Sequence, residues 1–65
     1  MIDTNRLKSV MVLNEKTQED VAKHLGMSSK TFYLRMKKDI FGSDEIEKMI
    51  DYLHIDDPVS IFFAK

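Results

Sequence analysis

The sequence predicts an all-α fold, a compact domain of four or five short helices. Apolar residues recur at the three- and four-residue spacings of helices, with charged residues between them. The 65 residues include only two glycines and one proline, and they contain no repeat or low-complexity segment. Because this length is near the lower limit for a chain that folds alone, we expect residues 1–65 to form a single domain with a small core.

The composition narrows what stabilises the chain and where it works. It has no cysteine, so disulfides and cysteine-ligated zinc are excluded, and stability must come from helix packing, dimerisation or both. No apolar run reaches about 18 residues, and residues 1–10 lack the apolar centre of a signal peptide. We therefore expect a soluble intracellular protein that does not enter a membrane.

The net charge of −1 hides an uneven distribution along the chain. Residues 16–38 carry six basic and two acidic side chains, a net charge of +4, whereas residues 39–65 carry two basic and seven acidic side chains, a net charge of −5. Residues 1–15 are neutral. A basic middle beside an acidic tail is typical of a polyanion-binding face, although ordinary surface charge would give the same distribution.

The first helix is predicted over residues 5–13. Thr4 or Asn5 can cap it, because a short side-chain oxygen accepts a hydrogen bond from a free amide of the first turn. Its buried stripe follows the spacing i, i+3, i+4 and is widened by two neighbours. These residues are Leu7, Val10 and Met11, with Val12 and Leu13 beside them. Asn14 is expected to end the helix in a left-handed conformation.

The second helix is predicted over residues 18–25. Thr17 is its expected N-cap, and Asp20 stands three residues later, which is an acidic variant of the capping box. The inward-facing residues are Val21, Ala22 and Leu25. Gly26 follows the last of them, where a positive φ costs least, so we expect a tight turn there.

The third helix is predicted over residues 29–37, with Ser28 as its N-cap. Met27 and Phe32 stand at the two positions of a hydrophobic staple, which fixes the direction of entry, and Phe32 and Met36 form the buried side. At about 100° per residue, one set of side chains points away from that side. This set is Lys30, Tyr33, Leu34 and Lys37. An outer face with two lysines, a tyrosine and a leucine is the unusual feature of this short helix.

Residues 39–42 are predicted to lead into a fourth helix over residues 44–53, with Phe41 tucked beneath the connection. Gly42 or Ser43 caps this helix, and acidic residues in its first turn suit the positive end of the helix dipole. Its predicted core residues are Ile46, Met49, Ile50 and Leu53.

A last short helix is predicted over residues 59–63. Asp57 followed by Pro58 is typical of a helix start. Phe62 and Phe63 are adjacent and cannot face the same side of a helix, so one of them is expected at the surface or at a partner.

The second and third predicted helices together form a recognisable pattern. The residues that carry it are Gln18, Glu19, Val21, Ala22, Leu25, Gly26, Met27, Ser28, Thr31 and Phe32. In this order and spacing they resemble the helix-turn-helix of phage repressors of the lambda-repressor/Cro type, over about residues 17–37. The tail from Phe41 to Phe63 is also similar to small phage Cro-like regulators, so the resemblance covers nearly the whole chain.

The resemblance implies a lambda-repressor-like fold and a sequence-specific transcriptional regulator that binds a palindromic DNA operator as a homodimer, with helix 29–37 in the major groove. The base-contacting residues are then Ser29, Lys30, Tyr33 and Leu34. The residues expected at the DNA backbone are Gln18, Ser28, Thr31, Lys37 and Lys38. Arg35 can add general attraction to DNA or pair with an acidic neighbour. A leucine at position 34 favours contact with a thymine methyl group.

Two expectations concern partners. A chain without a second, dimerising domain favours the short Cro-like kind of regulator, and the tail is then the expected dimer contact, through Phe62 and Phe63. The alternative is a protein-binding module, such as an anti-repressor or antitoxin-like partner. It would use Tyr33, Leu34 and the exposed C-terminal phenylalanine as an apolar surface.

Catalysis, metal binding and cofactors find no support in the residues. His24 and His54 lie in different elements, and neither has a second ligand at i+3 or i+4. The sequence contains neither a Ser/His/Asp arrangement nor a glycine-rich phosphate loop. We therefore expect a protein that is not an enzyme and has no small-molecule substrate. The resemblance to phage repressors implies that it acts in the cytoplasm of a bacterial host cell, encoded by a phage or prophage.

Overall fold

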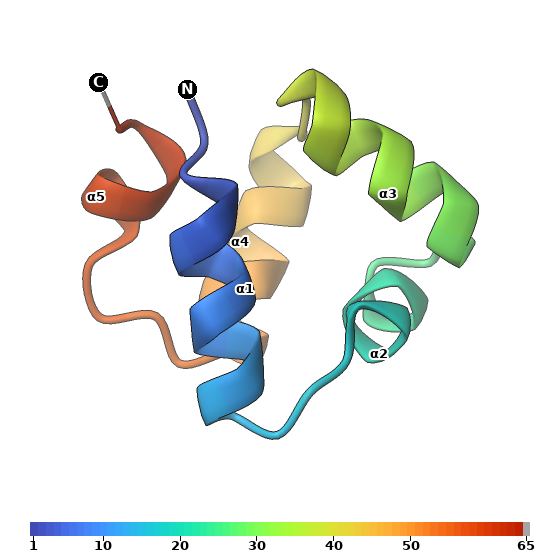
Figure 1. Cartoon of the computed structure of the whole chain (residues 1–65), viewed down its shortest axis with the longest axis horizontal. Coiled ribbons are helices and arrows are strands. Elements are labelled where there is room, and N and C mark those ends of the chain that lie inside the picture. Colours follow the sequence, from blue (N-terminus) through green and yellow to red (C-terminus); the bar gives the residue numbers. More distant parts are fainter. Residues whose placement is uncertain (65) are drawn as a thin grey trace.

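The computed structural model describes residues 1–64, and its architecture is all-helical, as predicted. The five helices in this range are α1 (Thr4–Leu13), α2 (Gln18–His24), α3 (Ser29–Lys38), α4 (Ser43–Tyr52) and α5 (Pro58–Phe62) (Figure 1). No strand occurs among these 64 residues. Lys65, the last position of the predicted domain, lies outside the described residues.

The helices enclose one small core. Helix α2 packs against α3 and α4, while α5 packs against α1 on the side away from α3 (Figure 1). The largest fully buried side chains are Phe32, Leu7, Met11, Met49, Leu53 and Val21. They come from the first four helices and, for Leu53, from the residue that caps α4, and Ile61 and Phe62 close the core from α5. No polar or charged side chain is buried among the described residues, so apolar packing holds the helices together.

Helix α1 begins and ends differently from the prediction. Asp3, rather than Thr4 or Asn5, is the N-cap, and its side chain accepts a hydrogen bond from the Arg6 amide at 3.0 Å. At the other end, Asn14 has a φ of −95°, and the left-handed residue is Glu15, with a φ of 57°. The Asn14 side chain is used for tertiary bonding instead: its Nδ2 donates to the Leu53 carbonyl at 2.8 Å.

The predicted widening of the buried stripe on α1 is wrong. Leu7 and Met11 are buried, but Val12 is 75% exposed and Leu13 is 80% exposed. Each successive side chain of a helix is rotated by about 100° around the helix axis. Leu13, two residues beyond the buried Met11, therefore points away from the core. Helix α1 therefore presents apolar side chains to solvent.

Helices α4 and α5 follow the prediction with small shifts. Gly42 is the N-cap of α4, Met49 and Leu53 are fully buried, and Ile46 and Ile50 are only half-buried at the edge of the core. Helix α5 begins at Pro58, one residue earlier than predicted, with Asp57 as its cap. Of the adjacent phenylalanines, Phe62 is 3% exposed and Phe63 is 64% exposed, which confirms that one of them lies at the surface.

In the described part of the chain, no helix has both the length and the apolar character needed to cross a membrane.

Candidate nucleic-acid interface

The start of α2 is fixed by the predicted capping box. The Thr17 hydroxyl oxygen accepts the Asp20 amide at 3.0 Å, and the Asp20 carboxylate accepts the Thr17 amide at 2.9 Å. These hydrogen bonds stabilise the ionised carboxylate, so the pKa of Asp20 lies below its ordinary value, and the main-chain bond to Thr17 is the largest cause. Gln18, the first helical residue, is therefore held in one place.

The turn between α2 and α3 is closed by the backbone. Gly26 has a φ of 77°, its amide donates to the Lys23 carbonyl, and the Met27 amide donates to the Ala22 carbonyl, both at 3.0 Å. This is the pair of bonds of a Schellman ending. A Cβ on Gly26 would meet nothing within 4 Å, so glycine is required for its backbone conformation and not for space.

The N-terminus of α3 uses the Ser28 side chain fully. Its oxygen accepts the Thr31 amide at 3.1 Å, and its hydroxyl donates to the Thr31 hydroxyl oxygen at 3.0 Å. Ser28 is thus the predicted N-cap, and its hydroxyl is already occupied by the cap. The Thr31 hydroxyl accepts in this contact, which leaves its own hydrogen available to an outside acceptor.

Helix α3 divides cleanly into two sides. Phe32 and Met36 are buried, and the ring of Phe32 lies 5.6 Å from that of the half-buried Phe41. On the opposite side Tyr33 is 58% exposed and Leu34 is 42% exposed. The remaining candidate residues on α3 are also exposed: Ser29, Lys30, Thr31, Lys37 and Lys38. The candidate base-contacting side chains are therefore all accessible.

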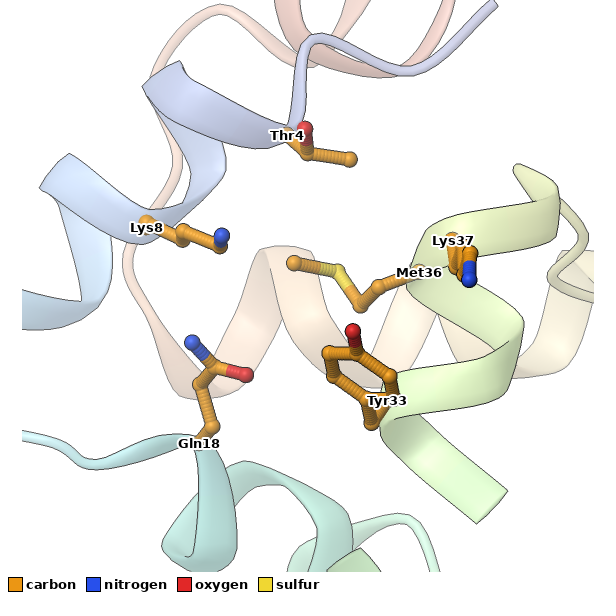
Figure 2. Close-up of a pocket in the computed structure, with 6 residues that line it drawn as sticks. All are labelled: Thr4, Lys8, Gln18, Tyr33, Met36 and Lys37. Atoms are coloured by element: carbon orange, nitrogen blue, oxygen red, sulfur yellow. The ribbon is translucent and has the colours of Figure 1, made fainter. Parts of the chain in front are cut away.

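A hollow of about 410 Å³ lies on one flank of this outer face, between residues of α1, α2 and α3. Figure 2 shows its lining residues: Thr4, Lys8, Gln18, Tyr33, Met36 and Lys37. Two lysines, an amide and two hydroxyl groups gather here, and the lining contains no carboxylate. Such a set suits a phosphate group. Sequence reasoning missed Thr4 and Lys8, although their i, i+4 spacing places them on one side of α1.

A second, smaller hollow of about 220 Å³ lies on the other flank of α3. It is lined by Thr31, Leu34, Arg35, Lys38 and Ile40. Ile40 is 59% exposed beside Leu34, so the outer face of α3 continues as an apolar strip into the loop that follows. This contribution of Ile40 was not predicted, because nothing in the sequence of a connecting loop indicates which way one isoleucine points.

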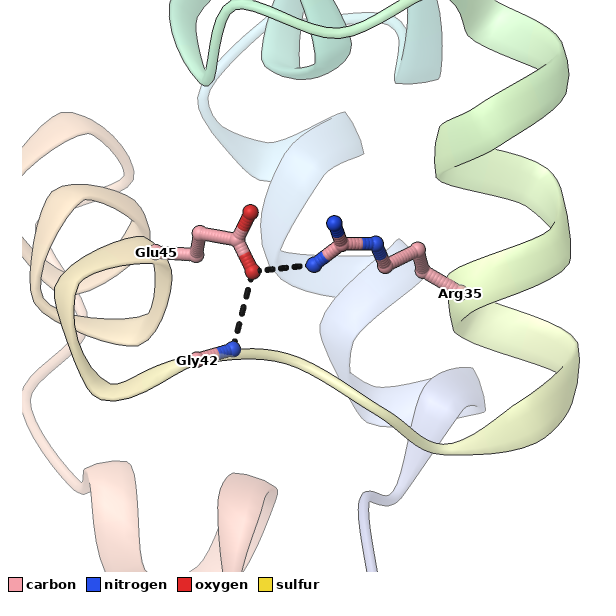
Figure 3. A network of polar contacts seen from close by, with 3 residues as sticks. All are labelled: Arg35, Gly42 and Glu45. Carbon is pink, nitrogen blue, oxygen red and sulfur yellow. Dashed lines mark hydrogen bonds and ion pairs between the residues drawn. The ribbon is translucent and has the colours of Figure 1, made fainter.

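Arg35 is turned away from the outer face. Its Nη1 lies 2.6 Å from the Glu45 carboxylate, which also accepts the Gly42 amide at 2.8 Å (Figure 3). Of the two roles left open for Arg35, pairing with an acidic neighbour is the one observed. The contact links the C-terminal half of α3 to the first turn of α4 and so helps to hold α3 in place.

His24 stacks on Tyr52, with ring centroids 4.0 Å apart, and Lys16 lies 5.0 Å from the centre of the Tyr52 ring. Within residues 1–64, no group of three or more His, Cys, Asp or Glu side chains is placed to hold a metal ion.

This arrangement can be compared with known proteins. The family model for the bacteriophage CI repressor helix-turn-helix domain matches residues 4–53, which is 50 of the 65 residues and extends from α1 to the end of α4. No curated protein and no solved structure matches the chain. The matched segment contains α2, the Gly26 turn, α3 and both hollows. The chain therefore belongs to the bacteriophage CI repressor helix-turn-helix family, and it is a DNA-binding transcriptional regulator of the repressor type.

Proposed function

We propose that this repressor binds a palindromic operator as a homodimer and inserts α3 into the major groove of each half-site. The observation that carries the proposal is the outer face of α3, which is exposed, bears lysines and is flanked by one hollow on each side. A helix lying in the major groove has a DNA backbone on either side of it. We expect those backbones to pass beside the two hollows.

Base reading falls to the exposed residues of α3. Lys30, in its first turn, donates to guanine O6 and N7, and Leu34, one turn later, contacts a thymine methyl group. Ser29 and Tyr33 flank them on the same exposed side of the helix. This assignment keeps the four base-contacting residues predicted from the sequence. Lys30 reads its base by hydrogen bonding, whereas Leu34 reads its base by apolar contact.

Phosphate binding falls to the two flanks. Gln18 and Lys37 face one strand across the larger hollow, together with Lys8 of α1, and Thr31 and Lys38 face the other strand from the smaller one. Since the Ser28 hydroxyl is occupied by its cap, we expect Ser28 to contact DNA through its main-chain amide. These contacts fix the register of α3 without reading sequence.

Repression follows from occupancy. A homodimer with half-sites about one helical turn (~34 Å) apart covers promoter DNA and blocks polymerase. In this proposal residues 1–65 act as one domain of a Cro-like regulator, without a cofactor, in the cytoplasm of the bacterial host. The family is one of DNA-binding proteins and not of enzymes.

The test is a selection from a random duplex library at near-physiological salt, read by sequencing. An enriched palindrome with half-site centres about 10 bp apart supports a dimeric reader of sequence. A single half-site without a symmetric partner overturns the homodimer. No enrichment by the folded protein overturns sequence-specific binding.

One observation favours a second function, a protein-binding module. Leu34 and Ile40 border one hollow, and Phe63 is 64% exposed, so apolar side chains are available to another protein. The dependence of binding on salt separates the two functions. Binding to DNA weakens steeply as salt rises because counterions are released from phosphates, whereas apolar docking does not.

A further inference from the structure

We propose that a second copy of this chain docks on the outer side of α1, against the loop between α4 and α5, and not through the C-terminal phenylalanine. We call this surface the α1 face, and define it by Arg6, Val10, Leu13, Ile55, Asp56 and Ile61. The inference rests on the proposed homodimer and locates its interface.

The α1 face pairs an apolar projection with a hollow. Leu13 is 80% exposed, with the exposed Val12 beside it. Next to Leu13 lies a hollow of about 400 Å³, whose apolar lining includes Val10, Ile55 and Ile61. A projection beside a recess suits a two-fold interface, in which each copy inserts the same residue into the other.

Opposite charges stand on the rim of the same hollow. Arg6 lies on α1, and Asp56 and Asp57 lie on the loop after α4. The Asp57 side chain accepts the Ser60 amide at 3.3 Å, and neither Arg6 nor Asp56 belongs to the one ion pair found within residues 1–64. A two-fold axis brings Arg6 of each copy toward Asp56 of the other, because every contact of an isologous interface occurs twice. This reciprocal pairing of opposite charges suits a second copy of this chain as the partner.

Hydrogen bonds within the chain preform the α1 face. The Asn14 side chain donates to the Leu53 carbonyl at 2.8 Å and to the Val10 carbonyl at 2.9 Å. The bond to Leu53 ties the C-terminal end of α1, where Leu13 stands, to the end of α4, and the bond to Val10 holds the Asn14 side chain against α1. A preformed surface loses less conformational entropy on association.

Docking on the α1 face leaves α3 free. In Figure 1, α5 and the loop before it lie on the side of α1 away from α3. The longest extent of the molecule is 27 Å, so two copies joined away from α3 hold their α3 helices apart by the order of one DNA turn (~34 Å).

A pair of charge reversals tests the inference without DNA. Arg6→Asp places an aspartate opposite the partner's Asp56, and Asp56→Arg places an arginine opposite the partner's Arg6. Each variant alone is expected to dimerise at least tenfold more weakly than the unaltered chain, as measured by sedimentation equilibrium. An equimolar mixture is expected to recover the dimer, because both pairs are complementary again in the mixed species. Both positions are exposed, and circular dichroism confirms that each variant is folded.

Several outcomes would overturn the inference. They are an unaltered chain that stays monomeric up to about 1 mM, single variants that dimerise normally, and a mixture that fails to recover the dimer. Leu13→Ser and Phe63→Ser form a further matched pair: the first is expected to weaken the dimer at least tenfold and the second to leave it unchanged. The reverse result places the interface on the tail.

Failure of this inference can be told apart from failure of the proposed function. Operator binding by the same variants is measured separately, by titration of a labelled duplex. A dimer formed through the α1 face that selects no DNA sequence would keep the interface and overturn the operator reader. A chain that reads a palindrome but dimerises through another surface would keep the operator reader and overturn the interface on the α1 face.

Discussion

Helices α1 and α3 are built alike and differ in what they show to solvent. Each has ten residues and is anchored in the core by two side chains one turn apart, Leu7 and Met11 in α1 and Phe32 and Met36 in α3. The outer side of α3 carries lysines and a tyrosine, whereas the outer side of α1 ends in Val12 and Leu13. Two anchors thus suffice to fix a short helix, which leaves the rest of its surface for a partner, and the two surfaces suit different partners.

The largest expected effect comes from the anchors. Phe32→Ala is expected to lower the free energy of unfolding by about 3–5 kcal/mol and Leu7→Ala by about 2–5 kcal/mol. A domain of this size has a total of only about 3–10 kcal/mol, so both variants are expected to be largely unfolded. Leu13→Ala and Leu34→Ala, on the outer sides of α1 and α3, should change the free energy of unfolding by about 0.5 kcal/mol. Urea unfolding measures all four. Equal losses of stability for Leu7→Ala and for the two variants of exposed leucines would contradict the distinction between buried anchors and exposed outer sides.

The contact that orients α3 should give an intermediate effect. Glu45→Ala removes both the ion pair with Arg35 and the acceptor for the Gly42 amide, and it is expected to cost about 1–2 kcal/mol of stability. Glu45→Gln keeps an oxygen for Gly42 and removes only the charge, so a loss of at most about 1 kcal/mol is expected. Thermal unfolding of both variants separates the two contributions. A Gln variant as unstable as the Ala variant would assign the whole effect to the charge.

Lys8 tests whether α1 takes part in DNA binding, because it lies on α1 but borders the hollow next to α3. Lys8→Ala is expected to weaken binding to operator and random DNA alike and to reduce the slope of log affinity against log salt by about one. Lys48→Ala, at an exposed position on α4, is the matched control and should leave the slope unchanged. Identical slopes for both variants would remove α1 from the DNA-binding surface.

The smallest expected effect concerns the capping box of α2. Because the pKa of Asp20 is lowered in the folded chain, the box stabilises the fold above the ordinary pKa of an aspartate, about 4. That contribution is lost as the pH falls through the lowered pKa, since the unfolded chain binds the proton more tightly. Asp20→Asn should abolish this part of the pH dependence in acid titrations followed by circular dichroism. A variant with the same acid transition as the unaltered chain would assign the transition to other carboxylates.

Local sequence predicted the elements and their buried sides well. The spacing of Phe32 and Met36 gave the buried side of α3, and Thr17 and Gly26 marked the start and end of α2 correctly, because capping and left-handed turns depend on neighbouring residues. The same reasoning found the outward direction of Lys30 and Leu34. Thus the helix-turn-helix and the outer face of α3 were predictable from residues 17–38 alone.

What sequence reasoning missed depends on contacts between distant segments. Asn14 was expected to be the left-handed residue, but its side chain bonds to Leu53, 39 positions away, and Glu15 takes the left-handed conformation instead. Val12 and Leu13 were expected inside because apolar neighbours widen a stripe, yet both are exposed, and no other helix within residues 1–64 covers them. Lys8 joined the hollow only when α1 was placed beside α2 and α3.

Base reading by α3 is tested most directly by the affinity of Lys30→Ala for the selected operator and for random DNA, measured at one salt concentration. If the outer face of α3 reads bases, the operator loses about 1–3 kcal/mol of binding free energy, and random DNA loses clearly less. Lys38 is expected to contact a phosphate, so Lys38→Ala should weaken binding to both duplexes equally. An equal loss on operator and random DNA for Lys30→Ala would contradict base reading by α3.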